Sequence, residues 1–367
     1  MKNIVIFGGG FDPIHNGHIN MAINASKALN AEVFFVPARV SVWKTESGAS
    51  VEDKIEMIKL AIAELKMENK LFVSEFEAKS YREVTYSIDT VMHFKKKFPD
   101  ANLYLLIGTD QVNSFDKWVK AEEIASLATV VFFQRPGYAL KIANINHFQM
   151  KKIDGDLIEE SSTAVKALKS MKIPYSVANY IIDKGLYFMN RIRSYMGENR
   201  YLHSISVAKL AADIAIANKI PEWWRYLRAG LLHDIAKEMP RADQEEVMAD
   251  FYPEYLDFPR QIYHQFLGEY LAKKDFGVVD EEELEAIKYH TTGKANLCKL
   301  AKVIYAADKI EPTRGFDSED LINKMKVNID KGFIEVLSAN REYFKTKNIA
   351  SDNTLTRECM ESYLADK

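Results

Sequence analysis

The chain has few of the features that mark secreted, membrane-spanning or nucleic-acid-coating proteins. Its two cysteines, Cys298 and Cys359, cannot form a disulfide framework and suggest a reducing compartment. No apolar run reaches the ~18 residues of a membrane helix, and the run Ile4–Phe7 is too short for a signal peptide. Basic and acidic residues number 49 and 52, so no global positive field favours nucleic acid. We therefore expect a cytoplasmic protein without a membrane or nucleic-acid partner.

The 367 residues contain two regions of different periodicity, which predicts two domains. Residues 1–190 alternate helical patterns with short apolar runs, which predict strands at Asn3–Phe7, Glu32–Pro37, Leu71–Phe76, Leu103–Ile107 and Thr129–Phe133. Such apolar strands suit a parallel sheet buried on both faces, so we expect a Rossmann-like α/β domain. Residues 199–367 show helical periodicity without strand signals, which predicts an all-α domain after a linker at 191–198.

A glycine-rich loop with two histidines follows the first expected strand and opens a helix. It reads Gly8-Gly9-Gly10-Phe11-Asp12-Pro13-Ile14-His15-Asn16-Gly17-His18. Glycines let a phosphate approach the backbone, and a helix N-terminus supplies free N–H groups. Two imidazoles three residues apart can face one phosphate and stabilise charge during phosphoryl transfer. A capped helix with two surface histidines is the structural alternative.

This loop resembles the T/H-x-G-H motif of the nucleotidyltransferase superfamily, and residues 1–190 most resemble bacterial nicotinate-nucleotide adenylyltransferases. Further segments follow in that family's order: Trp43-Lys44, Ser87-Ile88-Asp89-Thr90, Gly108-Thr109-Asp110, Trp118, Arg135-Pro136 and Ser161-Ser162-Thr163. The resemblance implies that the phosphate of nicotinate mononucleotide attacks the α-phosphorus of ATP, which is used with Mg²⁺, and that pyrophosphate leaves.

The same resemblance implies roles for individual residues. His15 and His18 would be catalytic and would stabilise the transition-state phosphates. The implied substrate contacts are Gly8, Gly9 and Phe11 around the shared nucleotide site, Lys44, Ser162 and Thr163 on phosphates, Thr85, Tyr86 and Trp118 at the pyridine end, Gly108 and Asp110 at the adenosine side, and Arg135.

Some of these residues also have purely structural interpretations. A core aromatic explains Trp118, a helix cap explains Asp110, and a surface loop cation explains Arg135. Two positions depart from the family: Gly10 stands in place of a threonine, and Lys166 in place of an arginine, which keeps the charge but loses the bidentate fork. His93 and His147 fit no motif, so we expect them to be structural or exposed.

A second set of polar residues lies in the helical region. His233-Asp234 is an adjacent pair on an otherwise apolar helix, where a buried carboxylate is costly unless a metal or a partner neutralises it. Further candidate ligands flank this pair: His203, His264, His290 and Asp308. Histidine and carboxylate together suit Fe, Mn, Zn or Co.

This set resembles the HD phosphohydrolase superfamily over residues 195–345, and its local strings resemble bacterial symmetrical diadenosine tetraphosphatases. The resemblance implies a core metal site of His203, His233, Asp234 and Asp308, with His264 and His290 holding a second ion and Asp234 bridging and catalytic. Iron is the expected metal, with manganese, cobalt and zinc as alternatives. Lys237 and Arg314 are candidates for binding the polyphosphate chain, although a solvated helix face explains both equally well.

We therefore expect a bifunctional enzyme that makes nicotinate adenine dinucleotide and hydrolyses diadenosine tetraphosphate to ADP. One rival hypothesis makes the helical domain a metal-stabilised nucleotide sensor. Another has adenylyl transfer to phosphopantetheine, against which Trp118 and the segment 85–90 argue. A pure binding or scaffold protein is least favoured. The sequence leaves open the oligomeric state, the coupling of the two sites and the preference for nicotinate over nicotinamide.

Overall fold

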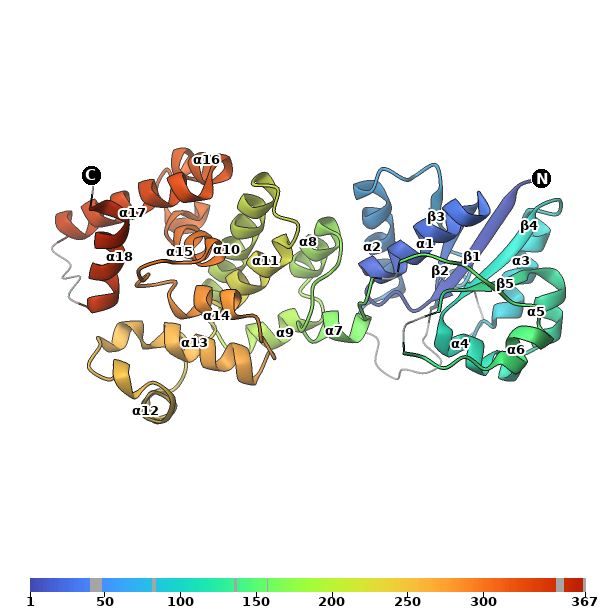
Figure 1. Cartoon of the computed structure of the whole chain (residues 1–367), viewed down its shortest axis with the longest axis horizontal. Coiled ribbons are helices and arrows are strands. Elements are labelled where there is room, and N and C mark those ends of the chain that lie inside the picture. Colours follow the sequence, from blue (N-terminus) through green and yellow to red (C-terminus); the bar gives the residue numbers. More distant parts are fainter. Residues whose placement is uncertain (40–47, 81–83, 135–136, 157, 348–352, 366–367) are drawn as a thin grey trace. The chain divides into compact units, whose positions relative to one another are not determined.

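The chain divides into two compact units, which are described separately here (Figure 1). The computed structural model describes residues 1–39, 48–80, 84–134, 137–156, 158–347 and 353–365. The first unit comprises Met1–Lys166 and Lys172–Tyr187, and the second comprises Ala167–Met171 and Phe188–Lys367. Apart from the short segment Ala167–Met171, the change from the first unit to the second thus comes after Tyr187. The domain limits expected from the sequence, 1–190 and 199–367 with a linker at 191–198, stay a prediction. Within the described ranges, no helix is both long and apolar enough to span a bilayer.

The first unit is built on a parallel sheet with the strand order β3-β2-β1-β4-β5-β6. The strands are β1 Asn3–Gly9, β2 Glu32–Pro37, β3 Leu71–Val73, β4 Asn102–Ile107, β5 Thr129–Phe132 and β6 Lys151–Lys152. The expected α/β class is confirmed, since each apolar run forms a strand. Chain order reverses between β1 and β4, where doubly wound folds bind their ligands at the carboxyl ends of the strands.

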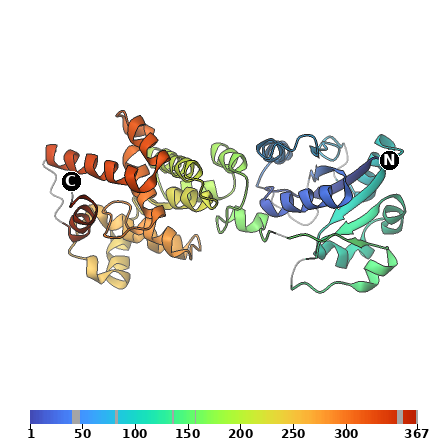
Figure 2. The same ribbon diagram turned by 45° about the horizontal axis from the view of Figure 1, so that its top comes forward.

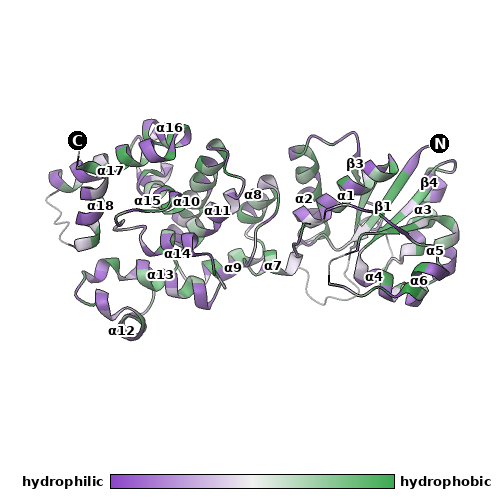
Figure 3. Cartoon of the chain, in the orientation of Figure 1, coloured by the Kyte–Doolittle hydropathy of each residue, from purple (hydrophilic) through white to green (hydrophobic). Residues whose placement is uncertain are grey.

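Helices cover both faces of this sheet (Figures 1 and 2). The helices of this unit are α1 Asn16–Leu29, α2 Val51–Glu64, α3 Ser87–Lys97, α4 Thr109–Ser114, α5 Ala121–Leu127, α6 Ile142–His147, α7 Ser162–Lys166 and α8 Tyr175–Asp183, of which α8 packs on α2. Val91 of α3 and Ile124 of α5 pack against Ile6 and Leu105 in one apolar core. Helices α1 and α2 contact β1, β2 and β3. In Figure 3 the strands are mainly hydrophobic, whereas the helices carry both kinds of residue.

The second unit is helical throughout the residues that the structure describes, as the periodicity predicts. Its helices are α9 Phe188–Arg193, α10 Glu198–Ala217, α11 Trp223–Leu232, α12 Arg241–Phe251, α13 Tyr263–Lys274, α14 Glu281–Lys288, α15 Lys299–Ile310, α16 Glu319–Val327, α17 Ile329–Thr346 and α18 Thr354–Leu364. Gly230 lets α10 and α11 approach closely, because a Cβ atom there would lie 2.5 Å from the Cα of Ala208. This close packing positions the residues that follow α11.

Candidate active sites

The glycine-rich loop ends at two stacked histidines. His15 is the N-cap of α1, and its Nδ1 accepts a hydrogen bond of 3.4 Å from the backbone N–H of His18. Because Nδ1 accepts, the proton of a neutral His15 ring lies on Nε2. The rings of His15 and His18 stack with centroids 3.6 Å apart. The loop therefore brings both imidazoles to one place at the helix N-terminus.

Phe11 packs this loop against the end of β1. Its ring meets the ring of His18 edge-on at 5.0 Å. A Cβ atom on Gly9 would lie 2.9 Å from the Phe11 ring, so only glycine lets the aromatic ring lie this close to the backbone. The two residues shape the loop together, as the sequence suggested for the nucleotide site.

A pocket of about 590 Å³ opens beside β1 and β4, where the strand order reverses. Six residues expected to bind substrate line it: Gly8, Gly9, Thr85, Tyr86, Asp110 and Trp118. Trp118 also packs on Phe115, with centroids 5.0 Å apart, so its ring serves the core as well as the pocket. The pocket thus coincides with the switch point of the sheet.

The start of α4 argues against a purely capping role for Asp110. Gly108 is the N-cap, and its N–H donates to Oε1 of Gln111 at 3.0 Å, so Gln111 closes the cap. Asp110 is exposed in the first turn and lines the pocket. A Cβ atom on Gly108 would lie 2.8 Å from Asp110 Oδ1. Glycine therefore leaves space for this carboxylate.

Helix α7 lies beside the histidine loop. The Ser162 hydroxyl donates to the Pro13 carbonyl at 2.9 Å, whereas Thr163 is exposed. Lys166, which replaces the family's arginine, forms an ion pair with Asp12. The Tyr187 hydroxyl donates to the same carboxylate at 2.7 Å. Two further expected contacts, Lys44 and Arg135, lie outside the described residues.

The six expected metal ligands converge in the second unit. They come from α10, α13 and α15 and from just beyond α11 and α14: His203, His264, Asp308, His233, Asp234 and His290. Asp234 joins two histidine pairs. Its Oδ1 lies 3.3 Å from His264 Nε2 and 3.4 Å from His290 Nε2. Its Oδ2 lies 3.6 Å from His233 Nε2 and 3.9 Å from His203 Nε2.

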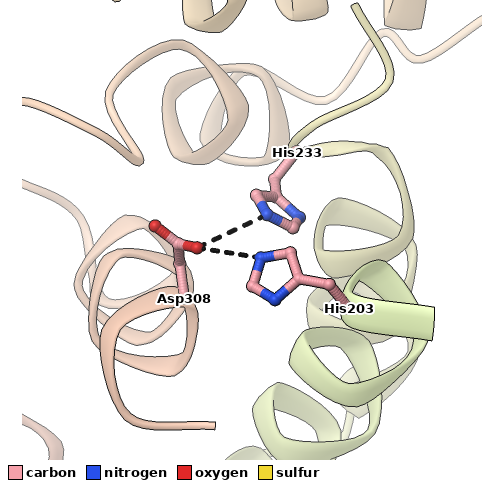
Figure 4. A group of neighbouring side chains, drawn as sticks. All are labelled: His203, His233 and Asp308. Atoms are coloured by element: carbon pink, nitrogen blue, oxygen red, sulfur yellow. Dashed lines mark hydrogen bonds and ion pairs between the residues drawn. The ribbon is translucent and has the colours of Figure 1, made fainter. Parts of the chain in front are cut away.

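Asp308 completes one of these groups. Its Oδ1 lies 3.1 Å from His203 Nε2 and 3.7 Å from His233 Nε2, and the three side chains point toward one another (Figure 4). Ligand atoms of His203, His233 and Asp308, and of His233, Asp234 and His290, lie within 4.8 Å of one another in each group. The spacing suits a centre that holds metal ions.

The histidine ring nitrogens are oriented by local backbone. The Nδ1 atoms of His233, His264 and His290 lie 2.7–2.9 Å from the carbonyl oxygens three residues earlier. Each Nδ1 therefore carries the proton, and each Nε2 lone pair points into the cluster. Among the described residues, Nε2 of the fully buried His233 has no hydrogen-bond partner. A metal ion would satisfy this orphaned nitrogen, so the donor set fits divalent metals.

The electrostatics keep these groups in ligating forms. Burial lowers the pKa of His233 to about 4 and holds the pKa of His264 well below its usual value, so both rings stay neutral. Burial would raise the pKa of Asp308, but the Lys309 charge and the hydrogen bond from His203 hold it well below its usual range. Neutral imidazoles and ionised carboxylates are the forms that bind metal.

Each unit matches a known protein family, and known relatives contain both domains in one chain. Residues 6–168 match the cytidylyltransferase-like family, and residues 200–313 match the HD domain family. A probable nicotinate-nucleotide adenylyltransferase/Ap4A hydrolase of Mycoplasma genitalium is 35% identical over 346 residues, which cover 92% of this chain and 97% of the relative. The chain belongs to this two-domain family.

Two further relatives agree with this assignment. The protein of the same name in Mycoplasma pneumoniae is 32% identical and covers 84% of this chain and 89% of its own length. A probable nicotinate-nucleotide adenylyltransferase of Chlorobaculum parvum is 32% identical over 190 residues, which are 50% of this chain and 97% of the relative. This member of the adenylyltransferase/Ap4A hydrolase family is therefore an enzyme with nucleotidyltransferase and HD hydrolase domains.

Positively charged side chains surround the cluster of candidate metal ligands. Lys237 Nζ lies 3.0 Å from His264 Nε2, and Arg314 Nη2 lies 2.5 Å from Asp308 Oδ1, so both expected phosphate-binding residues reach the centre. Sequence reasoning missed Arg200, which pairs with Asp234 from α10, and Lys309, whose Nζ lies 2.8 Å from Asp308 Oδ2. Arg200 stands three residues before His203 on one helix, a spacing that was a usable signal.

Sequence reasoning also missed two carboxylates. Glu311 is 1% exposed, and its Oε1 accepts from His203 Nδ1 at 3.1 Å. Glu77 lines the pocket at the switch point of the sheet, where burial raises its pKa and Thr90 donates to it at 2.6 Å. No role was expected from the sequence for either residue.

The two histidines outside every motif have structural roles. His93 stacks on Phe76 with centroids 4.1 Å apart. His147 lies 2.6 Å from the Glu122 carboxylate on the surface. Both placements match the structural or exposed roles expected for these residues.

Proposed function

We propose that this chain is a bifunctional enzyme with one reaction in each domain. The first domain transfers the adenylyl group of ATP to nicotinate mononucleotide and releases pyrophosphate. The second hydrolyses diadenosine tetraphosphate symmetrically to ADP. The observation that carries the proposal is the presence of two separate groups of polar residues in a family of fused proteins. The first unit has the switch-point pocket and the stacked pair His15 and His18, and the second has the six-ligand cluster around Asp234.

In the transferase, the protein's task is to position two phosphates and to stabilise charge in the transition state. His15 donates from Nε2, and His18 supplies a second imidazole at the positive end of α1. The remaining contacts are proposed as the family resemblance implies. Gly8, Gly9 and Phe11 shape the shared nucleotide site, Gly108 and Asp110 hold the adenosine side, and Thr85, Tyr86 and Trp118 surround the pyridine end. Lys44, Ser162 and Thr163 contact phosphates, and Arg135 is a further substrate-binding residue. Mg²⁺ accompanies ATP.

In the hydrolase, His203, His233, Asp234 and Asp308 would hold one divalent ion, and His264, His290 and Asp234 a second. Bound there, the ions supply an activated water and neutralise phosphate charge. Lys237, Arg200 and Arg314 face the same centre and hold the polyphosphate chain. ADP is a well-stabilised leaving group, which favours a central cut. Iron is the proposed metal, with manganese, cobalt or zinc able to use the same nitrogen and oxygen donors.

The partners in this proposal are small-molecule nucleotides, with neither nucleic acid nor a membrane involved. The proposed location is the cytoplasm, where the two free cysteines stay reduced. Both sites use phosphate-binding cations and histidines, which suits ATP, nicotinate mononucleotide and diadenosine tetraphosphate.

One experiment tests both activities. The purified protein is incubated with ATP and nicotinate mononucleotide, and separately with diadenosine tetraphosphate and a divalent metal, and products are identified by chromatography. Nicotinate adenine dinucleotide in the first reaction and ADP alone in the second are expected. AMP and ATP in equal amounts would contradict symmetrical cleavage. Metal binding without turnover of any dinucleotide would favour a nucleotide sensor. In a parallel incubation with ATP and phosphopantetheine, transfer to phosphopantetheine and none to nicotinate mononucleotide would contradict the pyridine substrate.

A further inference from the structure

The hydroxyl of Thr291 belongs to the group formed by His264, His290 and Asp234. Thr291 Oγ1 lies 3.1 Å from His264 Nε2 and 3.0 Å from His290 Nε2. The two Nε2 atoms are 3.2 Å apart, and Asp234 Oδ1 lies 3.3 and 3.4 Å from them. Five of the six distances among these four potential donor atoms thus lie between 3.0 and 3.4 Å.

Hydrogen bonding within this group cannot satisfy all four atoms. The Nδ1 protons of His264 and His290 are engaged by the carbonyls of Gln261 and Ile287, so both Nε2 atoms are acceptors. The single hydroxyl proton of Thr291 can serve only one of them. The Lys237 ammonium lies 3.0 Å from His264 Nε2 and can serve the other. Asp234 Oδ1 still faces two ring nitrogens that carry no proton, and a divalent ion among these atoms would satisfy all of them. A regular tetrahedron with edges near these spacings has its centre about 2.0 Å from each corner, the usual bond length from a divalent metal to nitrogen or oxygen.

We propose that Thr291 Oγ1 is the fourth protein ligand of the second divalent ion, beside His264, His290 and Asp234 Oδ1. This inference rests on the proposed metal-dependent hydrolase. Threonine hydroxyls bind divalent ions in other phosphate-handling sites. The assignment gives each ion two imidazole nitrogens and two oxygens, because His203, His233, Asp308 and the other oxygen of Asp234 form the first set (Figure 4).

The two sets differ in charge, so the ions bind unequally. The first set contains the carboxylate of Asp308 and shares that of Asp234, whereas the second replaces a carboxylate with a neutral hydroxyl. The Lys237 ammonium also lies 3.0 Å from His264 Nε2 and must yield that nitrogen to an ion. The second ion is therefore the weaker and more easily exchanged one, and losing the Thr291 oxygen weakens it further.

The neighbouring Thr292 provides a matched control. It is 1% exposed, and its hydroxyl lies 3.1 Å from Gln265 Nε2 and donates to the Gly293 carbonyl at 2.9 Å. Its backbone N–H donates to Gln265 Oε1 at 3.2 Å. Thr292 therefore fixes the turn while Thr291 points into the cluster, and the two hydroxyls have separable roles.

The test titrates metal-free protein with Mn²⁺ by calorimetry and counts bound ions by elemental analysis. Two ions per chain are expected for the wild type and for Thr291→Ser. For Thr291→Val, which keeps the size of the side chain, the affinity of the weaker ion should fall ~10–100-fold, with the tighter ion unchanged. Thr292→Val should lower thermal stability yet keep both affinities. Far-UV circular dichroism and thermal unfolding of the same samples check that the helical unit is folded.

Wild-type affinities for both ions in Thr291→Val would overturn the assignment, as would a Thr291→Ser variant that loses the weaker ion. Thr291→Ala removes the hydroxyl without added bulk and gives the same comparison where the valine variant does not fold. A wild-type protein that binds no second ion would instead contradict the two-metal hydrolase proposal itself, so the two failures are distinguishable.

Discussion

Arg228 and Glu283 form a bidentate ion pair inside the helical unit, with N–O distances of 2.6 and 2.7 Å. Arg228 is 4% exposed and Glu283 is fully buried. Arg228 Nη1 also donates to the Lys169 carbonyl at 2.8 Å, in the segment Ala167–Met171 that belongs to the same unit. Arg228 lies on α11, and His233 and Asp234 directly follow this helix, so Arg228 links that segment to the helix that leads into the cluster of candidate metal ligands.

Arg228→Met should destabilise the helical unit by about 3–5 kcal/mol, because it leaves the Glu283 charge buried without a partner. Urea unfolding followed by circular dichroism measures the loss. The control is Arg241→Met in the same unit, whose partner Glu245 is exposed like Arg241 itself, so little change in the free energy of unfolding is expected. Equal losses in the two variants would mean that burial of the pair contributes nothing.

Asp234→Asn should abolish hydrolysis of diadenosine tetraphosphate and leave adenylyl transfer intact. The amide keeps the size of the side chain but lacks the charge that both histidine pairs face. Elemental analysis should show a fall in bound metal. Asp330→Asn, at an exposed ion pair with Lys302 in the same unit, should change neither metal content nor turnover. An Asp234→Asn variant with wild-type metal content and wild-type turnover would contradict the assignment of the metal site.

The sequence predicted most of the sheet because buried parallel strands need continuous apolar runs. Glu32–Pro37 has the same limits in both descriptions, whereas the run 71–76 forms a strand only to Val73, after which the chain turns at residues 76–79. Strand β6 was not predicted, since Lys151 and Lys152 are exposed and carry no apolar pattern. A two-residue strand depends on its partner β5 rather than on its own sequence.

The ligand set was predictable because metal-binding residue types in apolar helices are rare and conspicuous. Arg200 was signalled only by its spacing from His203 on one helix, and the roles of Lys309 and Glu311 were not predictable, because a charged residue at a helix is ordinarily solvated. Their roles depend on which faces of α10 and α15 meet, and packing determines that. The segment Ala167–Met171 was likewise assigned to the first domain, since its contacts with the second unit depend on Arg228 far along the chain.

Glu311→Gln should weaken metal binding although Glu311 is not an expected ligand. Its carboxylate accepts from His203 Nδ1 and from the hydroxyls of Ser206 and Thr313, which fixes the ring so that Nε2 faces Asp308. Losing such a carboxylate typically costs ~10–100-fold in metal affinity. Calorimetric titration with Mn²⁺ measures the change. The exposed Glu319→Gln, at the start of α16, is the control and should bind metal like the wild type.

Two measurements on Glu311→Gln distinguish a positioning role from a purely structural one. A purely structural role predicts lower thermal stability with unchanged affinity for metal. A positioning role predicts weaker binding of the ion that His203 holds, even at temperatures where the variant is fully folded. The two readouts, unfolding temperature and metal affinity, therefore separate the explanations.

His18→Ala should lower adenylyl transfer ~10²–10³-fold, because losing one preorganised donor to the transition-state phosphates typically has this effect. Hydrolysis of diadenosine tetraphosphate should persist, since the metal cluster belongs to the other unit. The ring of His18 stacks on His15 and meets Phe11, so thermal unfolding must be measured alongside to separate lost chemistry from lost packing. His147→Ala, which removes an exposed partner of Glu122 in the same unit, should keep wild-type transfer. A folded His18→Ala enzyme with normal transfer would show that the reaction does not need this imidazole. Equal loss of both activities in folded protein would contradict two independent sites.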